Sequence, residues 1–144
     1  MRTGGDRRKK IFLETSVMIR FLTQDDSVKF VDCAKLIERI EAGALQPVMS
    51  NVVVMEIVHV LTRLYKFDRT TVHAALELVL KLRNLSFIER TNTPRALALW
   101  QSTGIKYGDC LIATQIPKGV VLITYDADFG KIEGLDVMQP ERVI

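Results

Sequence analysis

Four carboxylates of this 144-residue chain stand where an α/β protein could use them for chemistry. Glu14 and Asp126 each follow a short apolar run, as acids do at the carboxyl end of a buried strand. Glu56 lies inside a valine-rich helical pattern, and Asp109 stands at the start of another helix. Gathered acids repel one another unless a cation is present, and oxygen-only ligands suit Mg²⁺ or Mn²⁺. The sequence therefore predicts a divalent-metal site if the fold brings the four together.

Three of the four acids also have an ordinary structural explanation. Glu14 could be a helix-start acid favoured by the helix dipole, and Asp109 could be a simple cap. A charge placed like Glu56, among valines, needs a cation, a metal or strong hydrogen bonds, and His59 one turn further on is a candidate partner. Asp128 could substitute for Asp126 or assist it. The combination of four is more specific than any one of them.

Other chemistries find little support in the sequence. The chain has no Walker-type phosphate loop, no GxGxxG motif and no convincing Ser/His/Asp set. His59 and His73 are its only histidines, and they form no spaced zinc motif. Cys33 and Cys110 are too few for a disulfide framework, so we expect buried, reduced thiols.

The acids must be positioned by strands that alternate with helices. Strand-like apolar runs are predicted over residues 10–13, 47–49, 85–88, 120–123 and 136–139, with helical patterns between them. This alternation predicts an α/β protein with a parallel sheet covered on both faces. Right-handed crossovers would bring the strand ends and the helix starts that carry the acids to one edge. Two helices are predicted in more detail. Val31, Ala34, Ile37 and Ile40 should form a buried stripe, and the valine-rich helix around Glu56 should be central.

Composition bounds the class of protein. The length fits one domain over residues 10–144, preceded by a flexible basic segment over residues 1–9. The net charge of +3 and the pI of about 9.0 give a mild preference for anionic partners. No apolar run approaches a membrane span and no secretory signal core follows the basic start, so we expect a cytoplasmic protein.

Four segments resemble the motifs of PIN-domain proteins, and most closely those of VapC-type toxins of toxin–antitoxin pairs. They are residues 11–26 (IFLETSVMIRFLTQDD), 53–61 (VVMEIVHVL), 107–113 (YGDCLIA) and 122–129 (LITYDADF), in the order and spacing of the family. The resemblance implies a three-layer α/β/α sandwich with a central, mostly parallel sheet of four to five short strands. It also implies Mg²⁺- or Mn²⁺-dependent RNA cleavage that leaves 5′-phosphate and 3′-hydroxyl ends. A small antitoxin partner and a homodimer are implied as well.

Matched position by position, the resemblance makes Glu14, Glu56, Asp109 and Asp126 the catalytic acids. Glu14, Asp109 and Asp126 would hold one or two metal ions, with Glu56 binding directly or through water. The hydroxyls of Thr15, Ser16 and Thr124 would orient the ligands or metal-bound waters, or would be ordinary turn caps. Asp128 would support the acids. Arg20 and Lys106, which neighbour motif acids in sequence, could contact phosphates or equally form surface salt bridges.

One departure from the family concerns the first acid. The family usually has Asp at this position, followed by Thr and then Asn or Ser, and this chain has Glu14. The added methylene moves the carboxylate by about one bond length, and a misplacement near 1 Å can cost a factor of order 10² in rate. Two functions therefore remain open: an active ribonuclease, or a weak or inactive PIN-like module that binds RNA or a protein partner. An unrelated phosphoryl-transfer enzyme is disfavoured because the first strand lacks an aspartate nucleophile.

Overall fold

A computed structural model describes residues 8–144 of the chain. Most of the basic segment predicted over residues 1–9 therefore lies outside the described residues. Lys9, which the sequence assigned to that segment, is the first residue of a strand and pairs with Leu45.

Five parallel strands form the central sheet of the described chain. They are β1 (Lys9–Leu13), β2 (Leu45–Ser50), β3 (Ser86–Ile88), β4 (Val121–Ile123) and β5 (Val137–Met138). The strand order is β3-β2-β1-β4-β5, and every neighbouring pair runs parallel. All five predicted strands are thus present, and none of their ends is shifted by more than two residues.

Within residues 8–144, six α-helices and one short 3₁₀ helix lie between these strands, and a second 3₁₀ helix follows the last of them. They are α1 (Thr15–Thr23), α2 (Ser27–Glu41), α3 (Asn51–Arg63), α4 (Arg69–Leu80), α5 (Thr93–Thr103), α6 (Tyr107–Gln115), η1 (Ala127–Lys131) and η2 (Pro140–Arg142). Short polar side chains fix several starts: Asp26, Asp68 and Asn92 each accept a hydrogen bond from a backbone N–H of the first turn.

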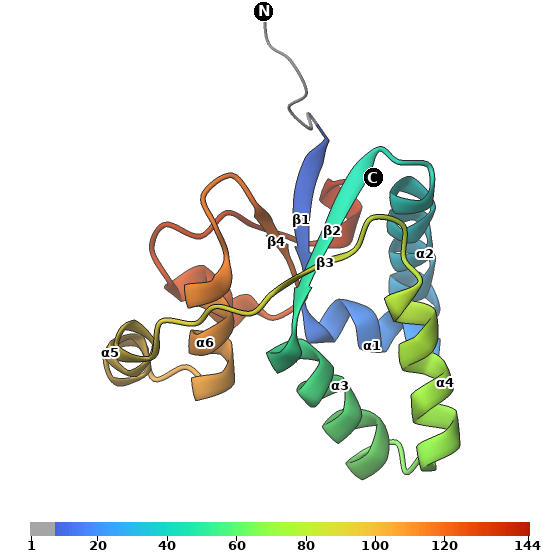
Figure 1. Cartoon of the computed structure of the whole chain (residues 1–144), viewed down its shortest axis with the longest axis horizontal. Helices are drawn as coiled ribbons and strands as arrows, with labels where there is room; N and C mark the ends of the chain where they lie inside the picture. Colours follow the sequence, from blue (N-terminus) through green and yellow to red (C-terminus); the bar gives the residue numbers. More distant parts are fainter. Residues whose placement is uncertain (1–7) are drawn as a thin grey trace, which may run out of the picture.

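The direction of the crossovers places the helices in two layers. The chain moves one way from β1 to β3, then returns past β1 to β4 and β5. With right-handed crossovers, this reversal puts the later helices on the opposite face of the sheet. Figure 1 shows α2 and α4 on one side of the strands and α5 and α6 on the other. The predicted three-layer α/β/α sandwich is confirmed.

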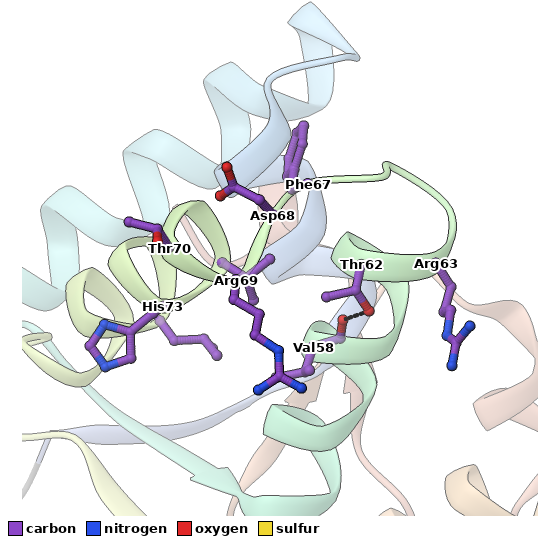
Figure 2. Close-up of a pocket in the computed structure, with 10 residues that line it drawn as sticks. Val58, Thr62, Arg63, Phe67, Asp68, Arg69, Thr70 and His73 are labelled. Carbon is purple, nitrogen blue, oxygen red and sulfur yellow. Dashed lines mark hydrogen bonds between the residues drawn. The ribbon is translucent and has the colours of Figure 1, made fainter.

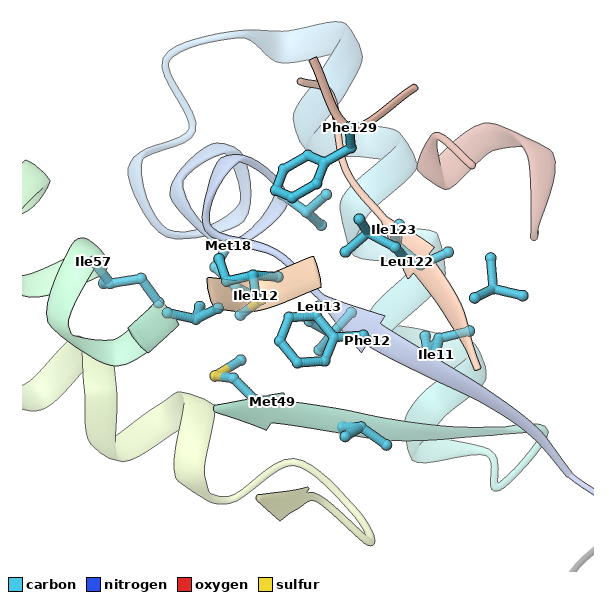
Figure 3. Packing of buried hydrophobic residues seen from close by; sticks show 14 of the residues in the cluster. Ile11, Phe12, Leu13, Met18, Met49, Ile57, Ile112, Leu122, Ile123 and Phe129 are labelled. Atoms are coloured by element: carbon cyan, nitrogen blue, oxygen red, sulfur yellow. The ribbon is translucent and has the colours of Figure 1, made fainter. Parts of the chain in front are cut away.

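The core is centred on β1, the middle strand. Ile11, Phe12 and Leu13 are fully buried, which explains why this run is apolar at every position. Figure 3 shows Phe12 and Leu13 between Met49 of β2 and Ile123 of β4. Burying one such side chain stabilises the fold by about 1.5–3 kcal/mol, so the end of β1 is a rigid support for the adjoining residues.

Two helix predictions need correction. In α2 the buried residues are Cys33, Leu36 and Ile40, whereas Val31 is 48% exposed, because the helix packs with a face rotated from the predicted stripe. Helix α3 is not central. It buries Val53, Ile57 and Leu61, but Met55 is 62% exposed, so its apolar composition reflects an uncovered surface. Both cysteines are buried and free, as predicted.

Across residues 8–144, none of the helices combines the length and apolar character that crossing a membrane requires.

Candidate active site

The site lies where the order of the sheet reverses. β1 and β4 are neighbours from which the chain continues in opposite directions, to β2 and to β5, and ligands of open α/β sheets bind at such a switch point. Glu14 follows β1 in extended conformation and its N–H donates to the carbonyl of Ile123, 3.1 Å away. Glu14 is also the residue that caps α1. Its side chain is therefore fixed at the carboxyl edge of the sheet.

Three of the four predicted acids meet at this edge. Each of Glu14, Glu56 and Asp109 offers a carboxylate oxygen that lies within 4.8 Å of those of the other two. They come from the end of β1, from α3 and from the first turn of α6. Glu14 and Asp109 are buried, at 4% and 1% exposure, and Glu56 is half-buried. Residues that lie up to 95 positions apart thus form one acidic cluster.

The carboxylate of Glu14 is held by three donors on one oxygen. Its Oε1 accepts from the Ser16 N–H at 3.0 Å, the Ser16 hydroxyl at 2.6 Å and the Thr124 hydroxyl at 2.6 Å. The two hydroxyls in turn accept from the N–H groups of Tyr125 and Asp126, at 2.9 Å each. Because both hydroxyl protons point to Glu14, the orientation of this acid is set by the backbone after β4. Its second oxygen, Oε2, receives none of these bonds.

Glu56 is held from α1. The hydroxyl of Thr15 donates to Glu56 Oε1 at 2.5 Å. Burial raises the pKa of Glu56, the Thr15 hydrogen bond lowers it, and the neighbouring charge of Glu14 raises it again. The predicted alternative for this acid is not what the structure shows, since its hydrogen-bond partner is Thr15 rather than His59.

Asp109 is the least satisfied acid of the cluster. It is not a helix cap: both of its carboxylate oxygens are buried and have no hydrogen-bond partner among the described residues. Burial raises its pKa to about 7, the ammonium of Lys106 lowers it, and Glu14, Glu56 and Asp126 raise it. The ammonium of Lys106 lies 3.9 Å from Asp109 Oδ2 and is largely exposed, so it compensates the buried charge only weakly.

This donor set fits a divalent cation. A buried carboxylate without a partner costs free energy that a bound ion would recover. The cluster consists of carboxylate oxygens only, the donor type that Mg²⁺ and Mn²⁺ prefer. Glu14, Glu56 and Asp109 are the residues that could hold the ion.

Asp126 stands beside this cluster rather than in it. It follows β4, lines the same hollow and caps η1 by accepting the N–H of Asp128 at 2.9 Å. It is not one of the three acids whose oxygens approach within 4.8 Å. Asp128 lies farther out, partly exposed, and its carboxylate pairs with Lys131 at 3.2 Å.

The cluster opens into a hollow of about 580 Å³. Both predicted phosphate contacts, Arg20 and Lys106, line it. Arg20 forms an ion pair with Asp25 at 3.0 Å, and the hydroxyl of Tyr65 donates a hydrogen bond to Asp25 at 2.6 Å. Sequence reasoning did not anticipate that apolar side chains also line this hollow, namely Ile19, Met55, Val60 and Leu64.

A larger hollow of about 970 Å³ lies between α3 and α4, as Figure 2 shows. Its one acid, Asp68, caps α4 by accepting the N–H of Thr71 at 2.8 Å. Its one histidine, His73, pairs with Glu77 at 2.9 Å. Among residues 8–144, the acids that could hold a metal ion lie at the smaller, acidic hollow and not in this groove.

The fold and the site define an α/β/α protein with an acidic centre of metal-binding type at the switch point of its sheet. The PIN domain family model matches residues 11–135. The chain therefore belongs to the PIN domain family, whose members are generally nucleases.

Solved structures of low sequence identity have a similar fold. One is the crystal structure of VapBC2 from Rickettsia felis bound to a DNA fragment from their promoter. The similarity has a TM-score of 0.65 at 16% identity and covers 90% of this chain and 98% of that one. Another is PAE2754 from Pyrobaculum aerophilum, with a TM-score of 0.63 at 18% identity, covering 98% of this chain and 90% of that one. No curated protein sequence matches the chain.

Proposed function

We propose that the protein is a Mg²⁺- or Mn²⁺-dependent endoribonuclease and the toxin of a toxin–antitoxin pair. The observation that carries the proposal is the Asp109 carboxylate, buried without a partner beside Glu14 and Glu56. The membership in the PIN domain family and the similarity of the fold to the VapBC2 structure support it.

The residues of the site would have different roles in metal binding and substrate binding. Glu14, Glu56 and Asp109 would hold the ion, and Asp126 would assist from the same hollow. When bound, a divalent ion lowers the pKa of a water and offsets negative charge on the leaving oxygen. Lys106 would attract the phosphates of the substrate. One or two ions are compatible with these residues.

The supporting hydroxyls keep the acids in place. Ser16 and Thr124 would fix one oxygen of Glu14 and leave the other for the ion, and Thr15 would do the same for Glu56. Such contacts make a site rigid before the substrate arrives. The alternative function, a weak or inactive module that binds RNA or a protein, is less favoured because Glu14 reaches the cluster despite its extra methylene.

Incubation of a mixed RNA pool with the protein tests the proposal. We expect cleavage with Mg²⁺ or Mn²⁺, none with EDTA, and products with 5′-phosphate ends detected by ligation-dependent sequencing. Asp136→Asn, which changes an exposed acid away from the hollow, is the matched control and should cut like the native chain. A native chain that binds RNA without cutting it would favour the binding module instead.

Loss of either hydroxyl beside Glu14 should weaken catalysis without unfolding the protein. Ser16→Ala and Thr124→Val each remove one donor to Glu14 Oε1, so we expect cleavage to fall by about 10- to 100-fold. The control is Thr103→Val, which removes a hydroxyl that donates to the carbonyl of Leu99 away from the site. Equal rates for all three variants would exclude a positioning role for the hydroxyls.

Lys106→Ala should weaken substrate binding more than turnover. Its ammonium is exposed at the mouth of the hollow, so removing it takes away attraction for the RNA backbone. We expect KM to rise several-fold, about tenfold at most, with a weaker dependence on salt. Arg20→Ala should have the smaller effect of the two, since Asp25 already neutralises Arg20. A fall in kcat alone would place Lys106 at the chemical step.

We also propose three features of the setting: an antitoxin partner, a homodimer and a cytoplasmic location. The VapBC2 structure supports the first, since it holds VapBC2 on a DNA fragment from their promoter. Exposed Leu97 and Trp100 on α5, each 51% accessible, offer an apolar surface that favours the second. Light scattering of the purified chain tests the dimer. Co-expression with a small reading frame preceding the gene tests the antitoxin.

A further inference from the structure

Gly108 lies directly before Asp109 in the first turn of α6, where this helix meets Glu56 of α3. A Cβ atom at this position would lie 3.2 Å from Glu56 Oε2 and 4.0 Å from its Cδ. The first distance is shorter than an ordinary contact between a methyl group and an oxygen. Any side chain at residue 108 would therefore press on the Glu56 carboxylate.

The other oxygen of the same carboxylate is already fixed. Glu56 Oε1 accepts a hydrogen bond from the hydroxyl of Thr15 at 2.5 Å, and Oε2 is the atom that a Cβ at residue 108 would approach most closely. The carboxylate thus sits between α1 and α6 with little freedom to move. Displacing it from the α6 side would disturb both the bond to Thr15 and its distance to Asp109.

Backbone conformation does not account for this glycine. The described glycines with left-handed φ are Gly43, Gly104, Gly119 and Gly134, so Gly108 is not among those whose backbone requires it. Within a helix, glycine is less favourable than alanine. A residue that weakens its own helix is explained here by the space that the neighbouring carboxylate occupies.

We propose that Gly108 is a positioning residue, whose missing side chain lets Glu56 share one site with Asp109. The inference rests on the proposed function for its catalytic consequence, since the site is taken to hold a metal ion. Its structural content stands on the contact between Gly108 and Glu56 alone.

A double-mutant cycle tests the proposal. Gly108→Ala should weaken Mn²⁺ binding, measured by electron paramagnetic resonance, and RNA cleavage by about tenfold, because a displaced ligand near the reaction costs rate steeply. In a Glu56→Asp background, where the shorter side chain leaves room, the same change should cost less than about twofold. Gly130→Ala is the matched control, because nothing lies within 4 Å of its Cβ position.

The outcomes separate the two proposals. A crystal structure of metal-free Gly108→Ala should show the Glu56 carboxylate displaced and its bond to Thr15 lengthened. If the carboxylate keeps its place, or if Gly108→Ala costs the same in both backgrounds, the role of Gly108 is overturned. If the native chain binds no Mn²⁺ while the carboxylate still moves in the variant, the proposed function fails and the positioning role stands.

Discussion

Asp109→Asn is expected to make the metal-free protein more stable and to abolish metal-dependent cleavage. The native carboxylate is 1% exposed and has no hydrogen-bond partner, so its ionised form is costly. An amide of the same shape carries no charge to bury. It is also a poor ligand for Mg²⁺, so RNA cleavage should fall by a factor of at least about 10².

The raised pKa of Asp109 determines how the stability of the native chain depends on pH. Burial raises the pKa of Asp109 in the folded protein to about 7, from an ordinary value of 3.8. The folded state therefore keeps its proton where the unfolded state has lost it. The free-energy cost to folding from this buried carboxyl grows from pH 4 to pH 7, and above pH 7 it reaches at most about 4 kcal/mol. Asp109→Asn removes it.

Thermal unfolding in EDTA measures the effect. At pH 8 the Tm of Asp109→Asn should exceed that of the native chain by about 5–10 °C, and the difference should shrink toward pH 5. Mg²⁺ should raise the Tm of the native chain and leave that of the variant unchanged. The control Asp136→Asn should change neither the Tm in EDTA nor the increase of the Tm with Mg²⁺. If the metal-free variant is less stable than the native chain at pH 8, Asp109 is not an uncompensated buried charge.

The parts of the site that could be predicted from the sequence are those fixed by strand ends. Glu14 follows three fully buried residues of β1, and a parallel sheet with right-handed crossovers brings the carboxyl ends of β1 and β4 to one edge. The same crossovers placed the helix starts near Glu56 and Asp109 at this edge, and the family resemblance assigned both acids to the site. The structure brings these two acids and Glu14 together.

The parts that could not be predicted depend on rotation and distance. The face that α2 buries is set by its tertiary contacts, and a spacing of three residues in Val31, Ala34, Ile37 and Ile40 does not determine it. Nor does the apolar composition of α3 separate core from uncovered surface, as the exposed Met55 shows. Position after a strand also did not reveal that Asp126, which caps η1, is outside the group of three acids that approach one another.

Gly108 shows a further limit. The sequence presents it only as one member of the Tyr-Gly-Asp motif, and helix propensity argues against it. Its contact is with Glu56, 52 residues earlier, so no local pattern contains the information. The same holds for the bond between Thr124 and Glu14, which spans 110 residues.

Glu14→Gln is expected to abolish cleavage while preserving the fold. The glutamine carbonyl can still accept from Ser16 and Thr124, so the three hydrogen bonds at Oε1 are kept. The second oxygen becomes an NH₂ group, which repels a cation instead of binding it. We expect an unchanged Tm without metal, a loss of the Tm increase with Mg²⁺, and a fall in rate of at least about 10²-fold.

Glu14→Asp decides whether this site is built for the longer acid. The donors of Ser16 and Thr124 converge on Oε1 at the length of a glutamate, and shortening the side chain withdraws the carboxylate by roughly 1.5 Å. The variant cannot keep both hydroxyl bonds and its distance to Asp109, so we expect at least about a tenfold loss of cleavage. The opposite result, an inert native chain that begins to cut as Glu14→Asp, would mean that the hydroxyls hold Glu14 in an inactive position. The chain would then be a binding module that one methylene keeps from catalysis.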